Sequence, residues 1–282
     1  MESSKGELTA PPQYVDAHCH LTSEEFDADL DAVVGRARAA GVARCLVNTE
    51  NAADFEKAAA LSDRFDGFCQ PCYGVHPVQY DRTDSGDLLG RSVRIEEVAP
   101  LESWLSQNSG RTIAIGECGL DFTPRYIHSD ADKPSQRDVF KRQIDLAKQY
   151  QLPIICHSRS AGKPVIEALV ERGARDVLLH AFDGGVKAVQ LGVDAGFYFS
   201  IPPCIAHSQQ KEALAKTVPL DRLLLETDAP VLGPSKTERN EPANIAIAAQ
   251  HVARVKALSV DAVAQAALAN TLRLFPKLRH LL

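Results

Sequence analysis

The fold is indicated by the stretch Val15-Asp16-Ala17-His18-Cys19-His20-Leu21-Thr22. This stretch distinguishes a closed barrel from an open sheet, the two folds in which parallel strands alternate with helices. It begins as an apolar strand and leads into a segment with helical periodicity. An open, doubly wound sheet usually has a glycine-rich turn after its first strand. The turn at Cys19–Thr22 contains no glycine. This turn therefore favours a closed barrel over an open sheet.

Strand-like and helix-like segments alternate along the whole chain. Nearly continuous apolar strands are typical of parallel strands that are buried on both faces. The pattern predicts an α/β fold, a (β/α)8 TIM barrel. The expected strands are Tyr14–His18, Ala43–Thr49, Gly67–Tyr73, Thr112–Glu117, Pro153–His157, Val177–His180, Phe197–Ile201 and Leu223–Asp228. The expected helices are Glu24–Ala40, Ala52–Arg64, Ile95–Gln107, Ser135–Tyr150, Lys163–Arg172, Val186–Ala195, Gln209–Thr217, Ala243–Ala257 and Ser259–Leu274.

The length of 282 residues suits one barrel domain over residues 14–282, preceded by a flexible segment over residues 1–13. The N-terminus has no apolar stretch of a signal peptide, and no apolar run approaches the roughly 18 residues of a membrane span. We therefore expect a monomer in the cytoplasm, with the nucleus as an alternative, that is neither secreted nor bound to a membrane. The segments His76–Arg94 and Leu120–Pro134 have no clear periodicity and are expected as irregular loops at the barrel mouth.

Seven cysteines and a net charge of −6 exclude some classes of protein. An odd number of cysteines without a secretory signal indicates reduced thiols and not a disulfide framework. Cys69 and Cys72 have C-x-x-C spacing, but no second pair completes a structural zinc site, so we interpret them as buried cysteines. The acidic net charge argues against a protein that binds nucleic acid through its overall field, although a local basic groove stays open.

Polar side chains that can bind a metal follow five of the predicted strands. His18 and His20 lie two apart on the first strand, so both imidazoles should point to the same side. Glu117 follows the fourth strand, and a carboxylate buried there would be costly without cations beside it. The remaining candidates are His157 after the fifth strand, His180 after the sixth and Asp228 after the eighth.

In a barrel these positions surround one pocket at the carboxyl ends of the strands. Six ligand side chains exceed the need of one tetrahedral ion and suit a two-metal centre. We predict that His18, His20, Glu117 and Asp228 bind one divalent ion. Glu117 would bridge to a second ion bound by His157 and His180. Glu226 shares the side of Asp228 but should lie deeper, as a partner of a ligand and not as a ligand itself.

The chain resembles the TatD family of metal-dependent hydrolases, within the wider amidohydrolase-like barrels. The resembling motifs occur in the family's order over about residues 14–275. They are Asp16-Ala-His-Cys-His-Leu21, Gly74-Val-His-Pro77, Gly116-Glu-Cys-Gly-Leu-Asp-Phe122, His157-Ser-Arg159, His180-Ala-Phe-Asp-Gly184, Glu226-Thr-Asp-Ala-Pro230 and Arg239-Asn-Glu-Pro-Ala-Asn244. Two features depart from the family: Ala181 replaces a cysteine, and the segment His76–Arg94 is long.

The resemblance implies a TIM barrel with divalent metal ions and hydrolysis of phosphodiester bonds in DNA, often from a 3′ end. In our hypothesis Asp228 is the general base and Glu117 bridges the ions. His76 contacts the phosphate or protonates the leaving oxygen. Arg159 is the best candidate for a phosphate clamp, because guanidinium matches phosphate oxygens in a bidentate way. Arg125 is a weaker candidate, together with Lys163 and Arg239, and Arg239–Asn244 should anchor the loop of Asp228.

Four histidine ligands favour zinc in the isolated protein, with manganese or magnesium as alternatives for the working metal. Two other functions stay open at this point. One is hydrolysis of another bond on the same two ions, such as the ester of a D-aminoacyl-tRNA or a small phosphodiester. The other is a non-catalytic, metal-bound scaffold protein, which would show no metal-dependent turnover.

Overall fold

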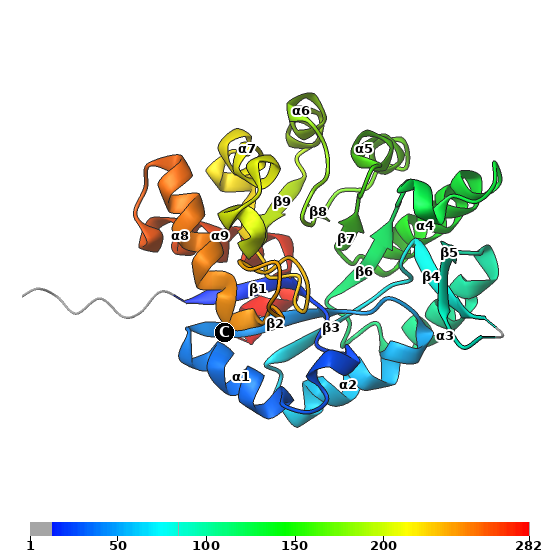
Figure 1. The fold of residues 1–282 in the computed structure, drawn as a ribbon, viewed down its shortest axis with the longest axis horizontal. Coiled ribbons are helices and arrows are strands. Elements are labelled where there is room, and N and C mark those ends of the chain that lie inside the picture. Colours follow the sequence, from blue (N-terminus) through cyan, green and yellow to red (C-terminus); the bar gives the residue numbers. More distant parts are fainter. Residues whose placement is uncertain (1–12, 84, 282) are drawn as a thin grey trace, which may run out of the picture.

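The predicted barrel is confirmed by the computed structural model, which describes residues 13–83 and 85–281 (Figure 1). Eight parallel strands form one sheet in the order β1-β2-β3-β6-β7-β8-β9-β10. The predicted N-terminal segment, apart from Gln13, lies outside the described residues. The strands are β1 (Tyr14–Cys19), β2 (Val42–Asn48), β3 (Cys69–Tyr73), β6 (Ala114–Gly119), β7 (Ile154–His157), β8 (Val177–Leu179), β9 (Tyr198–Ile201) and β10 (Leu223–Leu225).

The barrel closes where the chain leaves β10 and crosses to β1. The Asp228 N–H donates to the His18 carbonyl at 2.8 Å, and the His20 N–H donates to the Ala229 carbonyl at 2.8 Å. The last strand was predicted to extend to Asp228 but ends at Leu225. It ends early because the backbone turns toward β1, where the Thr227 N–H donates to the buried Asp16 carboxylate at 2.8 Å.

Helices surround the outer face of the barrel, as the periodicity predicts (Figure 1). One predicted helix, Glu24–Ala40, is divided: a short 3-10 turn at Glu24–Phe26 precedes α1, and Asp29 between them has a non-helical φ of −142°. Ser259 caps the last helix, since its side chain accepts the Ala262 N–H. The helices are α1 (Leu30–Ala39), α2 (Phe55–Arg64), α3 (Ala99–Asn108), α4 (Asp132–Tyr150), α5 (Gly162–Glu171), α6 (Val186–Asp194), α7 (Gln209–Thr217), α8 (Ile245–Lys256) and α9 (Val260–Leu274).

The barrel interior is a packed apolar cluster and not an open channel. Side chains from the strands, such as Val15, Leu46, Ile155 and Leu224, are in one cluster with residues of the C-terminal segment. Leu274, Phe275 and Leu278 are almost fully buried there. Since apolar side chains fill the interior, polar chemistry is confined to the carboxyl ends of the strands.

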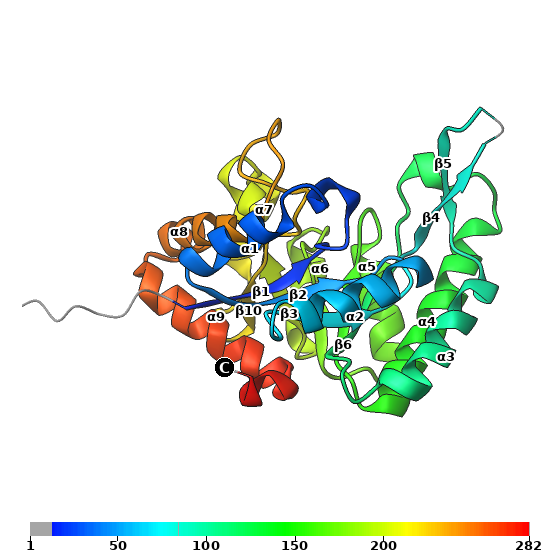
Figure 2. The same cartoon turned by 90° about the horizontal axis from the view of Figure 1, so that it is seen from below.

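A β-hairpin replaces the irregular loop expected at His76–Arg94. Strands β4 (Val78–Arg82) and β5 (Leu88–Ser92) pair antiparallel and project from the barrel beside α4 (Figures 1 and 2). The alternation was not evident in the sequence because the hairpin leaves large apolar side chains exposed, including Tyr80, Leu88 and Leu89. A strand without a buried face shows no clean period of two.

All seven cysteines are free and buried, as predicted for reduced thiols in the core. Within the described ranges, no helix has both the length and the apolar content needed to cross a bilayer.

Candidate metal centre

Glu117 lies at the middle of the predicted site. It is at the end of β6, is only 2% exposed, and each of its two carboxylate oxygens faces a different pair of histidines. Oε2 lies 3.4 Å from His18 Nε2 and 3.2 Å from His20 Nε2. Oε1 lies 2.8 Å from His157 Nδ1 and 2.7 Å from His180 Nε2. One carboxylate therefore joins imidazoles from β1, β7 and the end of β8.

Asp228 completes the group on the Oε2 side. Its Oδ1 lies 3.4 Å from His18 Nε2 and 3.4 Å from His20 Nε2. Asp228 has a positive φ of 55°, and this turn after β10 carries its carboxylate back over β1. The structure thus brings all six predicted ligand side chains to one end of the barrel.

The donor set fits divalent cations. The Nε2 atoms of His18 and His20 lie 3.1 Å apart, although two protonated imidazoles would repel each other there. The neighbouring donor atoms are 3.1 to 3.4 Å apart. A tetrahedral ion with bonds of about 2.1 Å separates its ligand atoms by about 3.4 Å. Nitrogen and carboxylate donors in this mixture suit zinc and similar ions.

Charge and burial act strongly on these groups. Burial alone would raise the pKa of Glu117, but the charges of His180, His76 and His18 hold that pKa well below its ordinary value. Burial would lower the pKa of His180, but the Glu117 carboxylate outweighs it and raises that pKa to about 10. The site is therefore an alternating cluster of acids and bases, which bound cations would reorganise by replacing the imidazole protons.

A second layer of hydrogen bonds orients the ligand side chains. His20 Nδ1 contacts the Asn48 carbonyl at 3.2 Å, which turns Nε2 toward the centre. Glu226 accepts hydrogen bonds from the Ala181 N–H at 2.8 Å and the Ser200 hydroxyl at 2.6 Å, and it lies 3.6 Å from His180 Nδ1. Glu226 is therefore a partner of a ligand side chain, the place expected from its position on the strand. Such partners fix ring orientation in metal sites.

Asp121 is a member of the site that was not predicted from the sequence. It is fully buried, and its Oδ2 lies 3.1 Å from His157 Nε2, on the side of the ring away from Glu117. The His157 and Arg159 side chains keep the pKa of Asp121 well below its ordinary value, although burial raises it. The available signal was its position in the Gly116–Phe122 motif, four residues after Glu117.

His76 lies next to the centre but farther from Glu117 than the other histidines. Its Nε2 is 3.7 Å from Glu117 Oε1, and its Nδ1 is 3.1 Å from the backbone of Val78. Burial lowers the pKa of His76. Since the backbone holds Nδ1, Nε2 is the atom that can contact a substrate or an ion, and the ring must first take up a proton if it is to protonate a leaving oxygen.

The four predicted basic side chains have different surroundings. Arg159 pairs with Asp121, with Nη2 at 2.6 Å and Nε at 2.8 Å from Oδ2, so one edge of its guanidinium is already bound. Arg125 is exposed and lies over the Tyr126 ring. Lys163 is a surface charge 3.3 Å from Glu167. Arg239 is bound in a bidentate way by Asp29 at 2.7 and 2.9 Å and therefore anchors the loop.

The loop that follows β10 is held by Asn240. Its Nδ2 donates to the Thr227 carbonyl and the Val231 carbonyl, both at 2.7 Å. These two carbonyls flank Asp228, so Asn240 fixes the turn that positions this carboxylate. The anchoring role expected for Arg239–Asn244 agrees with these contacts.

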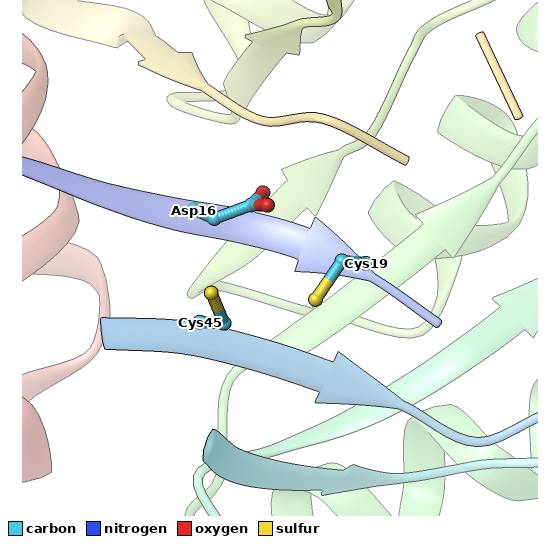
Figure 3. Close-up of side chains that lie close together, drawn as sticks. All are labelled: Asp16, Cys19 and Cys45. Carbon is cyan, nitrogen blue, oxygen red and sulfur yellow. The ribbon is translucent and has the colours of Figure 1, made fainter. Parts of the chain in front are cut away.

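A second cluster of metal-binding residue types, Asp16, Cys19 and Cys45, has a structural explanation. Figure 3 shows the Asp16 carboxylate on the opposite side of the β1 ribbon from the two sulfur atoms. That carboxylate accepts the Thr227 N–H and hydroxyl and so ties β1 to the segment after β10. Burial raises the pKa of the Cys19 and Cys45 thiols, which favours their neutral form. These residues are therefore parts of the core.

The chain is similar to known proteins over most of its length. The chain is 48% identical over 268 residues to deoxyribonuclease TATDN3 of Homo sapiens, which covers 95% of this chain and 96% of that protein. It is 35% identical over 236 residues to the 3′-5′ ssDNA/RNA exonuclease TatD of a Rahnella species, which covers 79% of this chain and 83% of that protein.

Solved structures share the fold. The TatD homologue YjjV of Escherichia coli matches with a TM-score of 0.81 and 26% identity, over 95% of this chain and 99% of that chain. A phosphotriesterase homology protein from Escherichia coli matches at 14% identity with a TM-score of 0.63 and shares the fold alone. The sequence profile described as TatD related DNase matches residues 15–276. The chain therefore belongs to the TatD-related DNase family.

Proposed function

We propose that this protein is a metal-dependent hydrolase that cleaves phosphodiester bonds of DNA, from the 3′ end of a strand. Family membership and the names of the two relatives support a nuclease. The observation that carries the proposal is the division of the Glu117 carboxylate between two sets of imidazoles. A carboxylate in this position can bridge two cations, as the hydrolysis of phosphodiesters by two ions requires.

Six side chains would hold the ions: His18, His20, Glu117 and Asp228 for one, and Glu117, His157 and His180 for the other. Imidazole-rich sites favour zinc in the isolated protein, and manganese or magnesium remain alternatives for activity. Bound divalent cations would supply positive charge that acidifies water and balances the charge that develops on phosphate.

The protein's own groups would move the proton and orient the substrate. Asp228 Oδ1 faces His18 and His20, and no group in the described part of the chain hydrogen-bonds to its Oδ2. Oδ2 is therefore free to accept the proton of the attacking water, the role of a general base. The free Nη1 edge of Arg159 could contact a phosphate oxygen while Asp121 holds the rest of the guanidinium.

A direct test combines metal analysis with end-labelled substrates. Protein freed of metal by chelation would be reloaded separately with zinc, manganese and magnesium, and each form incubated with single-stranded DNA, duplex DNA and RNA labelled at the 5′ end. We expect a ladder of shortened products that appears only after metal is added. If no metal led to shortened products and the protein hydrolysed a D-aminoacyl-tRNA, the nuclease proposal would be wrong. The ester hydrolase would then be the better interpretation.

Replacing His76 tests whether it protonates the leaving oxygen. His76→Gln should lower kcat on DNA about 10²-fold, the lower range for general acid catalysis. The same variant should retain most activity on bis-p-nitrophenyl phosphate, because p-nitrophenolate leaves without a proton. Steady-state kinetics on both substrates measures this difference. An equal loss on both would show instead that His76 contacts the phosphate or a metal ion.

Replacing Asp121 tests its control over His157. In Asp121→Asn the acceptor beside His157 Nε2 is weakened, so we expect about a 10- to 100-fold lower affinity for one metal ion. Calorimetric titration of the metal-free protein with zinc measures this affinity. Asp130→Asn, an exposed carboxylate nearby, is the matched control and should bind zinc like the wild type. Unchanged affinity in Asp121→Asn would refute the positioning role.

A further inference from the structure

The β4–β5 hairpin stands directly beside the metal centre. His76, with Nε2 at 3.7 Å from Glu117, contacts the backbone of Val78, the first residue of β4. A second connection runs from His157 through Asp121 and Arg159 to Tyr126, whose ring centroid lies 5.6 Å from the Arg159 guanidinium carbon. Two independent sets of contacts thus connect the hairpin side of the barrel to the proposed reaction site.

Tyr80 is the notable side chain of this hairpin. It is 54% exposed, and its hydroxyl lies 3.4 Å from the Tyr126 hydroxyl. Opposite Tyr80 on β5 is Gly90, where an added Cβ would lie 2.6 Å from the Tyr126 ring and 3.2 Å from the Tyr80 ring. The glycine therefore lets both rings lie against the hairpin. An exposed aromatic ring held in this way can stack on a base.

A cavity of about 380 Å³ lies at the foot of the hairpin, with Tyr80 in its wall. Glu50, Asn51, Val75 and Gln79 also line it. Its wall adjoins the metal centre, since the His76 N–H donates to the Glu50 carbonyl at 2.8 Å. The volume is near the lower end of the range for pockets that bind small organic molecules. A single nucleobase can be accommodated in such a space, whereas a duplex cannot.

Charges of both signs lie near Tyr80. The cavity wall carries Glu50, whose side chain is exposed, and would repel phosphate. Beside Tyr126, whose hydroxyl contacts that of Tyr80, the guanidinium carbon of Arg125 lies 4.5 Å from the ring centroid, and Arg159 lies near the same ring. In the described residues Arg125 has no ion-pair partner. A neutral base therefore suits the cavity, and the phosphate backbone suits the arginine side.

We infer that Tyr80 stacks on one unpaired base of a single-stranded substrate in this cavity, while Arg125 contacts the adjoining phosphate. The inference rests on the proposed function for the identity of the substrate as nucleic acid. The hairpin, which was predicted to be a loop, would then select single-stranded substrates next to the metal centre. A paired base could not enter, so binding should favour single strands over blunt duplexes.

The test measures binding without catalysis. Metal-free protein would be titrated into a fluorescein-labelled single-stranded DNA, and separately into one with 2-aminopurine at its 3′ end. Tyr80→Ala should weaken binding about 10-fold and abolish the quenching of 2-aminopurine that stacking causes, whereas Tyr80→Trp should retain both. Ala53→Phe, which places a large ring in the wall of the cavity at a position that is not a proposed metal ligand, should also abolish quenching.

Matched controls separate local effects from general ones. Leu191→Ala removes another exposed apolar side chain, on α6, and should bind like the wild type. Arg125→Gln should weaken binding and its salt dependence, whereas Lys187→Gln, an exposed charge on α6, should not. Circular dichroism would show that each variant is folded, and its zinc content after reconstitution would show that the metal centre is intact.

The outcomes distinguish this inference from the proposed function. In one outcome the wild type cleaves oligonucleotides, and Tyr80→Ala binds and quenches like the wild type. That result would overturn the role of Tyr80 and leave the proposed nuclease activity intact. In another outcome the quenching depends on Tyr80, but the wild type cleaves no oligonucleotide with any metal. That result would support the base pocket and refute the nuclease proposal. Equal affinity for single strands and blunt duplexes would also overturn the inference.

Discussion

Replacing Glu117 with glutamine is expected to disrupt both metal sites together and to lower phosphodiester hydrolysis by more than about 10³-fold. Glutamine has the same shape as glutamate, so it should fit the space in which Glu117 is 2% exposed. Its amide group, however, offers one oxygen and one NH2. Whichever way it turns, the NH2 faces either His18 and His20 or His157 and His180. An amide nitrogen that carries two protons does not bind a cation.

Metal content is the first measurement for this variant. After equilibration with zinc and removal of the free metal, mass spectrometry should find about two ions per wild-type chain and fewer than about one per Glu117→Gln chain. Glu171→Gln, an exposed carboxylate at the C-terminal end of α5, is the matched control and should keep both ions and full activity on bis-p-nitrophenyl phosphate. Two ions and normal turnover in Glu117→Gln would refute the bridging role.

The fold could be predicted because its signals are local. Most barrel strands are short, largely apolar runs that are buried on both faces, and this pattern is visible without tertiary information. The hairpin β4–β5 was missed for the opposite reason. Its stability comes from cross-strand pairing and from the contact of Gly90 with Tyr126, 36 residues away in the sequence, and neither leaves a periodic apolar pattern.

The set of candidate ligands could be anticipated because the barrel places the carboxyl ends of all its strands together. Glu226 could be anticipated as a partner of a ligand, but the partners of His157 and Arg159 could not. Asp121 looks like any loop carboxylate in the sequence, and only the return of β7 beside β6 brings it 3.1 Å from His157. Arg159 was predicted as a phosphate clamp, and its pairing with Asp121, which occupies one edge of the guanidinium, was not foreseen. Hydrogen-bond partners depend on side-chain directions that a one-dimensional pattern does not contain.

Replacing Asp228 with asparagine is expected to lower kcat about 10²- to 10⁴-fold with little change in KM, because it removes the proposed general base. Asparagine suits this position, since Asp228 has a φ of 55° and asparagine tolerates the left-handed region well. The Asp228 N–H would still donate to the His18 carbonyl and keep the turn in place. Its side-chain oxygen can still face His18 and His20, so metal loss should be smaller than in Glu117→Gln.

Three measurements separate the loss of a base from the loss of a ligand. Metal content, KM and kcat would be determined for Asp228→Asn and Asp228→Ala on bis-p-nitrophenyl phosphate, which needs no proton on its leaving group. A general base predicts that Asp228→Asn keeps its metal and loses turnover, and that added formate partly restores activity in Asp228→Ala by supplying a carboxylate. If turnover in Asp228→Asn falls only in proportion to bound metal, and excess zinc restores it fully, Asp228 acts as a ligand alone. In that case the proton of the attacking water must be taken up by another group of the site.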